Sequence, residues 1–595
     1  MSPSADSTSI AGFDALSCNK RLSAEGVAVP IDYKITKIII KCWRGIDALE
    51  LDLRPGFPNV LIGANNAGKT AVLDAIALVL NLPAFGGQWS PDVSDFYCDQ
   101  KGNRSGEFLL QVLFDATAET GYPAVRGVGT PISVRGVQVK GTLKDGKTKH
   151  QRTLLDEKLQ SILIAPRTAL GADDKAKWKD HGVNWMQYYA RLDEISEHAP
   201  EVWLFRPQEI EASLYVWKRG PIARLSRLLA QRFLTENWSI DREDGKKSPM
   251  PDTLYRAHEF FQKAVEMFPF WREDMKPKLE DAIARYVGSQ AKVDLRPDVQ
   301  LFEEWIAQQL AISLATDPAG VVTPLSSMGE GWQSIVRLAA LEALSQYKSE
   351  MKERVIVLLE EPETHLHPHL RRKLRKVLAE LAKAGWIVMY STHSPEMISF
   401  NSDQIITRLV RSGGKLTVNT VHTDKIAAPA KLQSKLDERG AHDFLFSAGT
   451  VFVEGRDDGF ACRYTFDGTG VDLDGRSISI TQCNAVSVIP AFAAIAKDLG
   501  IRWCALTDED KLPAGGINPK TESERKKIEA LRTNNDIQVQ WPGKLEACLG
   551  IAAPDKAVPE TTEPLIAHAD WRTNHPDYHS TAAAIAAWID PALKI

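Results

Sequence analysis

The sequence predicts a multidomain α/β protein in which a first α/β unit is interrupted by a helical insertion and a second α/β unit follows it. Three observations carry this prediction. A glycine-bearing loop that ends in Gly-Lys-Thr, at positions 63–70, lies between an apolar strand and a helix. Alternating strand and helix patterns occupy 31–149 and 300–425 and return at 446–595, with helical periodicity between 150 and 299. Acidic residues directly follow apolar strands at two separate places. At 595 residues the chain is too long for a single hydrophobic core.

The composition narrows the possible classes of protein. A net charge of -5 gives no overall basic field, so contacts with nucleic acid must come from a local patch. Seven scattered cysteines without a Cys-x-x-Cys pair fit neither a disulfide framework nor a zinc site. No apolar run approaches the length of a membrane helix. We therefore expect a soluble cytoplasmic protein with a flexible tail at 1–30 and no membrane partner.

The first unit, 31–149, is predicted to be one lobe of a nucleotide-binding domain. Apolar residues alternate with polar ones from Tyr33 to Leu53, which is typical of a β-hairpin or two neighbouring strands. A third strand at Val60–Ile62 leads into the glycine-bearing loop, and a helix follows from Ala71 to Leu80. Further strands are expected at Glu107–Phe114 and around Ile132–Val139.

The insertion, 150–299, has long stretches at helical period. The segment from Thr253 to Phe268 keeps one apolar face over several turns, which is compatible with a self-packed helical subdomain or with a dimerisation arm. A basic stretch in the insertion is either a solvated helix face or a DNA contact: Lys218, Arg219, Arg224, Arg227 and Arg232.

The α/β pattern resumes in the second lobe, 300–425, with strands at Val355–Leu359 and Trp386–Tyr390. A polar linker is expected at 426–445. The last unit, 446–595, has strands at Thr450–Val453, Ser477–Gln482 and Trp503–Thr507.

The loop at 63–70 fits a phosphate-binding loop in the strand–loop–helix context that such a loop requires. Its backbone N–H groups and the helix N-terminus attract phosphate, Lys69 would reach the β- and γ-phosphates of ATP, and Thr70 would ligate Mg²⁺. The expected nucleotide-binding residues of the loop are Asn65, Asn66, Ala67, Gly68, Lys69 and Thr70.

A second segment supports the nucleotide site. The apolar run Val355–Leu359 ends in Glu360 and Glu361, where a P-loop fold places its metal-side acid and its general base. His393 follows the next strand and could bind a γ-phosphate. Gly329 and Gly331 lie in a turn before a helix and form a second anion-binding N-terminus. By contrast, His365 and His367 lack evident partners as metal ligands, which favours a structural role.

A second acidic constellation lies in the C-terminal unit. Glu454 comes directly after a strand, and Asp458 is four residues later on an expected helix, so both can face one site. Asp508 and Asp510 form an Asp-x-Asp pair at the end of another strand, where an extended backbone would put both on the same side. Either cluster alone could be a solvated loop. Together they predict a hard-cation site for Mg²⁺ or Mn²⁺.

These motifs resemble known families. Asn-Asn-Ala-Gly-Lys-Thr, Met-Gly-Glu-Gly, Glu-Glu-Pro-Glu-Thr-His-Leu-His-Pro and Ser-Thr-His-Ser look like the RecF and chromosome-maintenance (SMC) branch of ABC-type ATPases. A Glu after one strand and Asp-x-Asp after a later one resemble a TOPRIM domain. The order of the two domains is similar to the OLD (overcoming lysogenization defect) nuclease family, which includes the Gabija nuclease subunit and retron-associated effectors.

The resemblance implies a nucleotide-regulated DNA endonuclease or nickase with a two-metal TOPRIM site, acting in antiphage defence on double-stranded DNA. Glu454, Asp458, Asp508 and Asp510 would be metal ligands, and Glu546 a further acid. The family's late lysine has only Lys544 and Lys594 as candidates here.

The resemblance also implies a homodimer or homotetramer, with a helicase or a reverse-transcriptase/RNA–DNA partner encoded nearby. The alternative function is a RecF-like DNA-binding assembly ATPase whose TOPRIM unit does not cut. Topoisomerase or primase chemistry is disfavoured because no tyrosine-bearing cleavage domain or zinc cluster accompanies the TOPRIM pattern.

Overall fold

The computed structural model describes most of the chain outside the insertion. Its main ranges are 34–80, 89–115, 135–161, 201–206, 327–345, 355–426, 429–439, 442–510, 516–552 and 557–593, without 402 and 569; short pieces lie between 163 and 324. The tail, the segment Thr253–Phe268, the five basic residues of the insertion and Lys594 lie outside the described residues. No described helix combines the length and the apolar character needed to cross a membrane.

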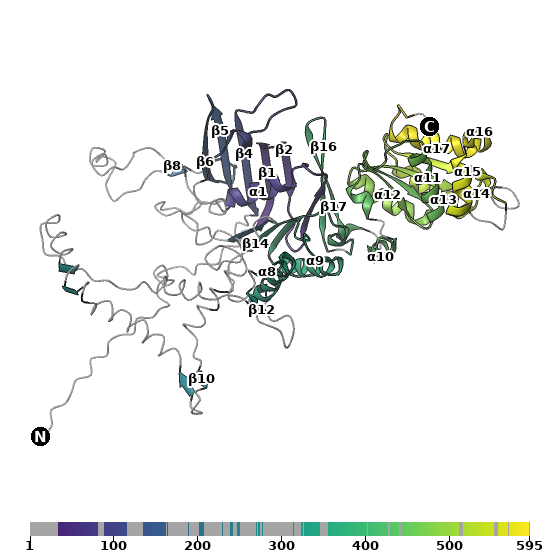
Figure 1. The fold of residues 1–595 in the computed structure, drawn as a ribbon. Helices are drawn as coiled ribbons and strands as arrows, with labels where there is room; N and C mark the ends of the chain where they lie inside the picture. Colours follow the sequence, from purple (N-terminus) through teal and green to yellow (C-terminus); the bar gives the residue numbers. More distant parts are fainter. Residues whose placement is uncertain are drawn as a thin grey trace, which may run out of the picture.

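The expected hairpin is part of a five-stranded antiparallel sheet with the order β2-β1-β4-β5-β6. Its strands are β1 (Lys34–Trp43), β2 (Ile46–Asp52), β4 (Glu107–Asp115), β5 (Gly136–Lys144) and β6 (Lys147–Leu155). Helix α1 (Lys69–Leu80) contacts this sheet on one side and the second sheet on the other (Figure 1). Because it is covered on both sides, α1 is almost entirely buried, which explains its nearly uniform apolar sequence.

The second sheet has six strands in the order β17-β16-β3-β15-β14-β9. Strands β3 (Asn59–Gly63), β14 (Val355–Glu360), β15 (Ile387–Ser391) and β16 (Ile405–Ser412) run parallel, and β17 (Lys415–His422) is antiparallel to β16. Parallel strands covered on both faces are apolar along their length, as β3 and β14 are. Their carboxyl ends therefore carry the phosphate-binding loop and the two glutamates to one edge of the sheet.

The expected helical insertion is wrong at its boundaries. Strand β6 continues to Leu155, and β9 (Glu201–Phe205) pairs in parallel with β14 as the edge strand of the second sheet. Residues from within the predicted insertion thus complete the nucleotide-binding core. The Met-Gly-Glu-Gly segment at 328–331, called the signature turn below, leads into α8 (Glu330–Ser345), and α9 (Pro368–Lys383) follows β14.

The expected polar linker is also structured. It contains α10 (Pro429–Arg439), on which Leu432 and Leu436 are buried, and the 3-10 turn η9 (Asp443–Phe446). Ser434 and Asp437 are exposed on the other side of α10, so the segment resembled a linker in sequence although it packs as an amphipathic helix.

The C-terminal unit is a four-stranded parallel sheet with the order β19-β18-β20-β21. The strands are β18 (Gly449–Val453), β19 (Ile478–Gln482), β20 (Arg502–Asp508) and β21 (Ile537–Trp541). The helices are α11 (Arg456–Gly468), α12 (Ile489–Asp498), α13 (Pro519–Leu531), α14 (Leu545–Leu549), α15 (Pro559–Ala567), α16 (Trp571–Asn574) and α17 (Pro576–Ile589).

The two units share a hydrophobic core. One cluster of buried side chains extends from Val60 and Tyr390 in the ATPase sheet to Phe452 and Trp503 in the C-terminal sheet. The interface between the units is therefore an apolar packing surface rather than a loose tether.

Candidate functional site

The phosphate-binding loop has the backbone that its sequence requires. Gly63 has φ of +146°, and a Cβ there would lie 2.5 Å from the carbonyl oxygen of Leu409. Gly68 and Asn66 also have positive φ, at +107° and +63°. Asn65 and Asn66 are exposed, whereas Ala67 is buried against the core. The loop is thus anchored at both ends with its tip facing solvent, and α1 begins directly after it.

Lys69 and Thr70 lie at the mouth of this loop. The Lys69 ammonium donates to the carbonyl oxygens of Gly63 and Ala64, at 2.9 and 3.1 Å. Burial lowers the pKa of Lys69, an effect opposed by the charges of Glu361 and Glu360. A buried ammonium held only by loop carbonyls fits a phosphate group, which would satisfy its charge.

The two glutamates of β14 face the loop from the neighbouring side. Glu360 accepts a hydrogen bond from the Thr70 hydroxyl, which brings together the two groups expected to hold Mg²⁺. Glu361 has φ of +42°, and its Oε1 lies 3.5 Å from Nε2 of His393. Burial and the charge of Lys69 lower the pKa of His393. The structure therefore places Thr70 beside Glu360 and Glu361 beside His393, and the sequence analysis had assigned all four side chains to the nucleotide site.

Sequence reasoning missed two supports of this site. Glu363 is 6% exposed and accepts hydrogen bonds from the Thr392 hydroxyl at 2.6 Å and the His393 N–H at 2.9 Å, which fixes the backbone at His393. Burial raises its pKa. The only signal in the sequence was the third acid of the Glu-Glu-Pro-Glu run.

The second missed support is an ion-pair group around Asp74 in α1. Arg44 approaches Asp74 at 2.5 Å and Arg206 pairs with it as well, while Arg206 Nε lies 3.9 Å from Glu360. Asp74 is buried, so the two guanidinium groups compensate its charge. The group ties β1, α1 and the end of β9 together beneath the nucleotide loop.

The signature turn makes a local contact with the segment after β14. Glu330 pairs with Nε2 of His365 at 2.8 Å, and a Cβ at Gly331 would lie 3.1 Å from the His365 carbonyl oxygen. A Cβ at Gly329 would meet no atom within 4 Å. His365 therefore has a structural contact, whereas His367 stacks on His369 at 5.8 Å.

In the C-terminal unit, Glu454 and Asp508 lie side by side because β18 and β20 are adjacent parallel strands. Oε1 of Glu454 accepts the backbone N–H of Asp508 at 3.0 Å. Burial is the largest of the causes that raise the pKa of Asp508 to about 7, and the charges of Asp458 and Glu454 add to it. The charge of Lys544 opposes this rise, whereas the charge of Glu546 contributes to it. Burial also raises the pKa of Glu454. The two acids thus form a partly desolvated negative pair.

Asp458 and Asp510 are the other two predicted acids of this site, and both accept hydrogen bonds from neighbouring protein groups. Asp458 accepts the Gly455 N–H and the Trp541 indole N–H, each at 2.9 Å, and burial raises its pKa. Asp510 accepts from Asn518 at 3.1 Å and Thr521 at 2.7 Å. The expectation that an extended Asp-x-Asp presents both aspartates to one side is wrong here, because β20 ends at Asp508 and Asp510 has φ of +48°.

Basic groups complete the edge of the acid pair. The guanidinium of Arg525, on α13, donates to the Asp508 carbonyl oxygen. Its positive charge lowers the pKa of Glu454 and so opposes the effect of burial. Lys544 immediately precedes α14, and Glu546 accepts weakly from the Ala557 N–H at 3.5 Å. Arg525 was missed because nothing in its helical sequence distinguishes it from solvated neighbours.

The acid pair has the chemistry of a divalent-cation site. Oδ1 of Asp508 is buried without a hydrogen-bond partner, so it has a free acceptor position. Among the described residues, no three His, Cys, Asp or Glu side chains converge as a ready-made metal site. Mg²⁺ commonly uses one or two carboxylates with waters and substrate phosphates, so a two-acid core still fits this ion.

Family comparisons agree with this division of the chain. The model described as "AAA ATPase domain" matches residues 34–163 and 240–398. The model described as "Overcoming lysogenization defect protein-like, TOPRIM domain" matches residues 445–510, which include Glu454, Asp458 and the Asp508/Asp510 pair.

Two of the similar proteins are named as OLD nucleases. The "OLD nuclease" of Thermus scotoductus is 27% identical over 235 residues, covering 38% of this chain and 43% of that protein. The "Old nuclease" of Escherichia phage P2 is 24% identical over 227 residues, covering 36% and 39%. The match thus spans less than half the length of these two relatives.

Among solved structures, an SMC head bound to the C-terminal winged-helix domain of ScpA covers 66% of this chain at 16% identity, with a TM-score of 0.36. The fold assignment does not depend on that low score. It rests on the strand orders described above and on the two matched domains. The chain thus combines an AAA-type ATPase domain with an OLD-like TOPRIM domain, and it is similar to the OLD nucleases.

Proposed function

We propose that this chain is an ATP-binding, nucleotide-regulated and metal-dependent DNA endonuclease or nickase. The observation that carries the proposal is the half-buried pair Glu454 and Asp508, with the free Oδ1 of Asp508. Burial raises the pKa of both carboxylates, and the charge of Glu454 further raises that of Asp508, so a bound cation would stabilise the charged form of each.

In this proposal Glu454 and Asp508 hold Mg²⁺ or Mn²⁺, which would activate water and neutralise charge on a scissile phosphodiester. Asp458 orients the start of α11 through its bond to the Gly455 N–H. Asp510, whose Oδ2 accepts from Asn518 and Thr521, would be a further ligand. Arg525 positions Asp508 through its backbone carbonyl.

At the nucleotide site, Lys69 and the loop amides would bind the phosphates of ATP, with Asn65 to Thr70 around them. Thr70 and Glu360 would hold Mg²⁺, since their side chains already meet. Glu361 is the proposed general base and His393 its neighbour on the γ-phosphate side. The extra methylene of Glu360, where many P-loop proteins have Asp, favours slow turnover.

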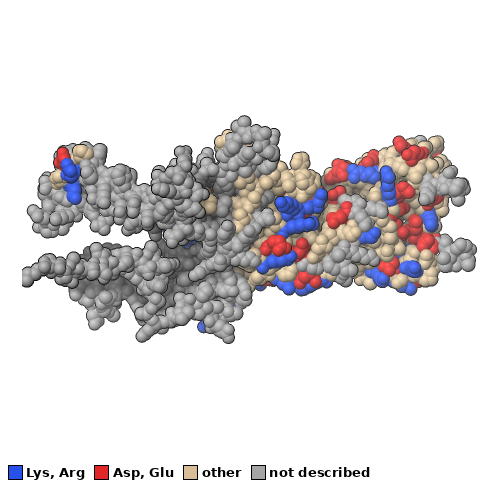
Figure 2. All heavy atoms as spheres, turned by 90° about the horizontal axis from the view of Figure 1, so that it is seen from below, with Lys and Arg blue, Asp and Glu red and all other residues tan. Residues whose placement is uncertain are grey.

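The substrate in this proposal is double-stranded DNA, and the assembly is a dimer or tetramer in which Gly329 and Gly331 complete a partner's nucleotide site. Acidic and basic side chains are interspersed on the described part of the face in Figure 2, consistent with contacts at local patches. Antiphage defence, a partner encoded nearby and a cytoplasmic location extend the family resemblance.

The test is incubation of the purified protein with supercoiled plasmid and Mg²⁺ or Mn²⁺, with and without ATP. We expect nicked or linear products from the wild type, none from Asp508→Ala, and an altered ATP response in Lys69→Ala. Asp498→Ala is the matched control, because Asp498 is exposed at the end of α12. If the wild type never cuts under any of these conditions, a DNA-binding ATPase that does not cut becomes the better account.

A further inference from the structure

One turn of the chain contacts both the nucleotide side and the acid side. This turn comprises η9 and Ser447, residues 443–447, and directly precedes β18, the strand that ends at Glu454. The Phe446 ring stacks on the His393 imidazole, with centroids 6.5 Å apart and planes 28° apart. His393 in turn approaches Glu361. The aromatic ring therefore lies against the side chain expected on the γ-phosphate side of the nucleotide site.

The same turn is held from a second direction by Arg408. This arginine is 6% exposed on β16, in register with Ile62 of β3, immediately before the phosphate-binding loop. Its guanidinium donates to three backbone carbonyl oxygens of the C-terminal unit: Ser447 at 2.6 Å, Gly500 at 3.1 Å and Leu499 at 3.2 Å. Burial lowers its pKa to about 10. Burying this cation costs desolvation free energy, which the three carbonyl acceptors offset.

The acceptors of Arg408 lie at the starts of both acid-bearing strands. Ser447 is two residues before β18, and Leu499 and Gly500 connect α12 to β20. Each strand then runs to its acid, Glu454 or Asp508. A strand of five residues spans roughly 17 Å and moves as a stiff unit, because its backbone hydrogen bonds are shared with both neighbours.

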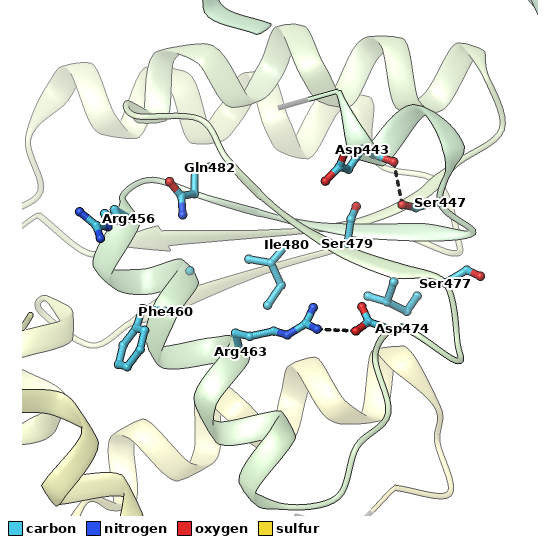
Figure 3. Close-up of a pocket in the computed structure, with 12 residues that line it drawn as sticks. Asp443, Ser447, Arg456, Phe460, Arg463, Asp474, Ser477, Ser479, Ile480 and Gln482 are labelled. Carbon is cyan, nitrogen blue, oxygen red and sulfur yellow. Dashed lines mark hydrogen bonds and ion pairs between the residues drawn. The ribbon is translucent and has the colours of Figure 1, made fainter. Parts of the chain in front are cut away.

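Space beside the turn permits it to move. Asp443 and Ser447 line a cavity of about 560 Å³ that also reaches Arg456 and Gln482 near the acid end of the sheet (Figure 3). Within the turn, the Ser447 hydroxyl donates to the Asp443 carbonyl at 2.9 Å, so these residues shift together. Phe444 and Leu445 of the same turn are buried in the core shared by the two units, so a displacement of the turn also shifts the packing at the start of β18.

We infer that Phe446 and Arg408 are positioning residues that couple the nucleotide site to the acid pair, a role that rests on the proposed function. Nucleotide binding reorients His393, Phe446 follows its ring, and the turn shifts against the carbonyl bonds of Arg408. The shift changes the spacing of Glu454 and Asp508 and hence their affinity for a divalent cation.

The test uses the full chain with Phe446→Leu, which keeps apolar volume but removes the ring, and Phe446→Tyr, which keeps the ring. Phe460→Leu is the control, because Phe460 on α11 stacks on Tyr464 within the C-terminal unit. Hydrogen exchange of peptides covering 63–72, 449–456 and 502–510 is measured with and without a non-hydrolysable ATP analogue and Mg²⁺. Plasmid cleavage is measured in parallel.

In three proteins, the wild type and the variants Phe446→Tyr and Phe460→Leu, the ATP analogue should change the hydrogen-exchange rate of both acid-bearing strands by about fivefold. This value is at the lower end of the range for allosteric coupling. Phe446→Leu should keep protection of 63–72 but lose the change at 449–456 and 502–510. A wild-type response in Phe446→Leu would overturn the coupling, as would a wild type without any response in the acid-bearing strands. If exchange responds as expected but no plasmid is cut, the coupling stands and the nuclease proposal fails.

Discussion

Replacing Asp508 with Asn should stabilise the metal-free protein at alkaline pH. The pKa of Asp508 is raised to about 7 from 3.8, chiefly by burial and then by Asp458 and Glu454. An acid with a raised pKa keeps its proton longer in the folded state, so the folded protein loses stability as pH rises between about 4 and 7. Above that window the carboxylate is charged in both states and the penalty is complete. Asn carries no charge and avoids it.

The size of the effect follows from the shift. A change of about three pKa units at about 1.36 kcal/mol each gives an upper limit of about 4 kcal/mol. Partial solvent access reduces this to about 2 kcal/mol. For a domain of 150 to 250 residues, each kcal/mol moves Tm by roughly 2–4 °C, so the C-terminal unit should melt about 4–8 °C higher in Asp508→Asn at pH 8.

The assay is thermal unfolding in EDTA from pH 5 to pH 8.5, for the wild type, Asp508→Asn and the exposed control Asp498→Asn. The Tm advantage of Asp508→Asn should be largest at pH 8 and shrink toward pH 5. Adding Mg²⁺ should raise Tm in the wild type more than in the variant, since only the intact acid pair binds the ion well. Equal Tm values at pH 8 in EDTA, or an advantage that does not depend on pH, would refute the reasoning.

Two further substitutions test the nucleotide side. Gly63→Ala should reduce ATP affinity by at least about tenfold, because the added Cβ would clash with the Leu409 carbonyl oxygen and because φ at this position is unfavourable for alanine. Titration with a fluorescent nucleotide measures the affinity, and an unchanged affinity would contradict the prediction. Asp74→Asn should destabilise the ATPase unit by about 3 kcal/mol, because Arg44 and Arg206 lose the buried carboxylate that they share. Denaturant unfolding measures the loss of stability, and a shift confined to the C-terminal unit would contradict the prediction.

Much of the fold could be predicted from the sequence because local patterns dominate it. The hairpin at 34–52, the strands β3 and β14 and the helix α1 were predicted from periodicity or from continuous apolar runs. By contrast, β9 was missed. Its partner β14 is about 150 residues away in the chain, and five residues give too little periodicity to distinguish a strand from a buried helix turn.

The site shows the same division. Glu454 and Asp508 were predicted to meet because both follow parallel strands, and they do. The partners of Asp510 could not be predicted, because its positive φ directs the chain toward α13. Arg525 and Trp541 also escaped prediction, since their roles depend on tertiary neighbours rather than on spacing.

The incomplete acid cluster has a physical consequence for regulation. A site with four converged carboxylates would bind a cation whatever the state of the ATPase unit. Here, among the described residues, no three such side chains converge, and Oδ1 of Asp508 is the buried acceptor of the acid pair that has no hydrogen-bond partner. Cation affinity then depends on small movements of β18 and β20, which are the strands that the buried guanidinium of Arg408 holds at their starts. Under the proposed coupling, a modest bias at the nucleotide site would control the acid pair in the other unit, because the controlled step would be the assembly of the metal site itself.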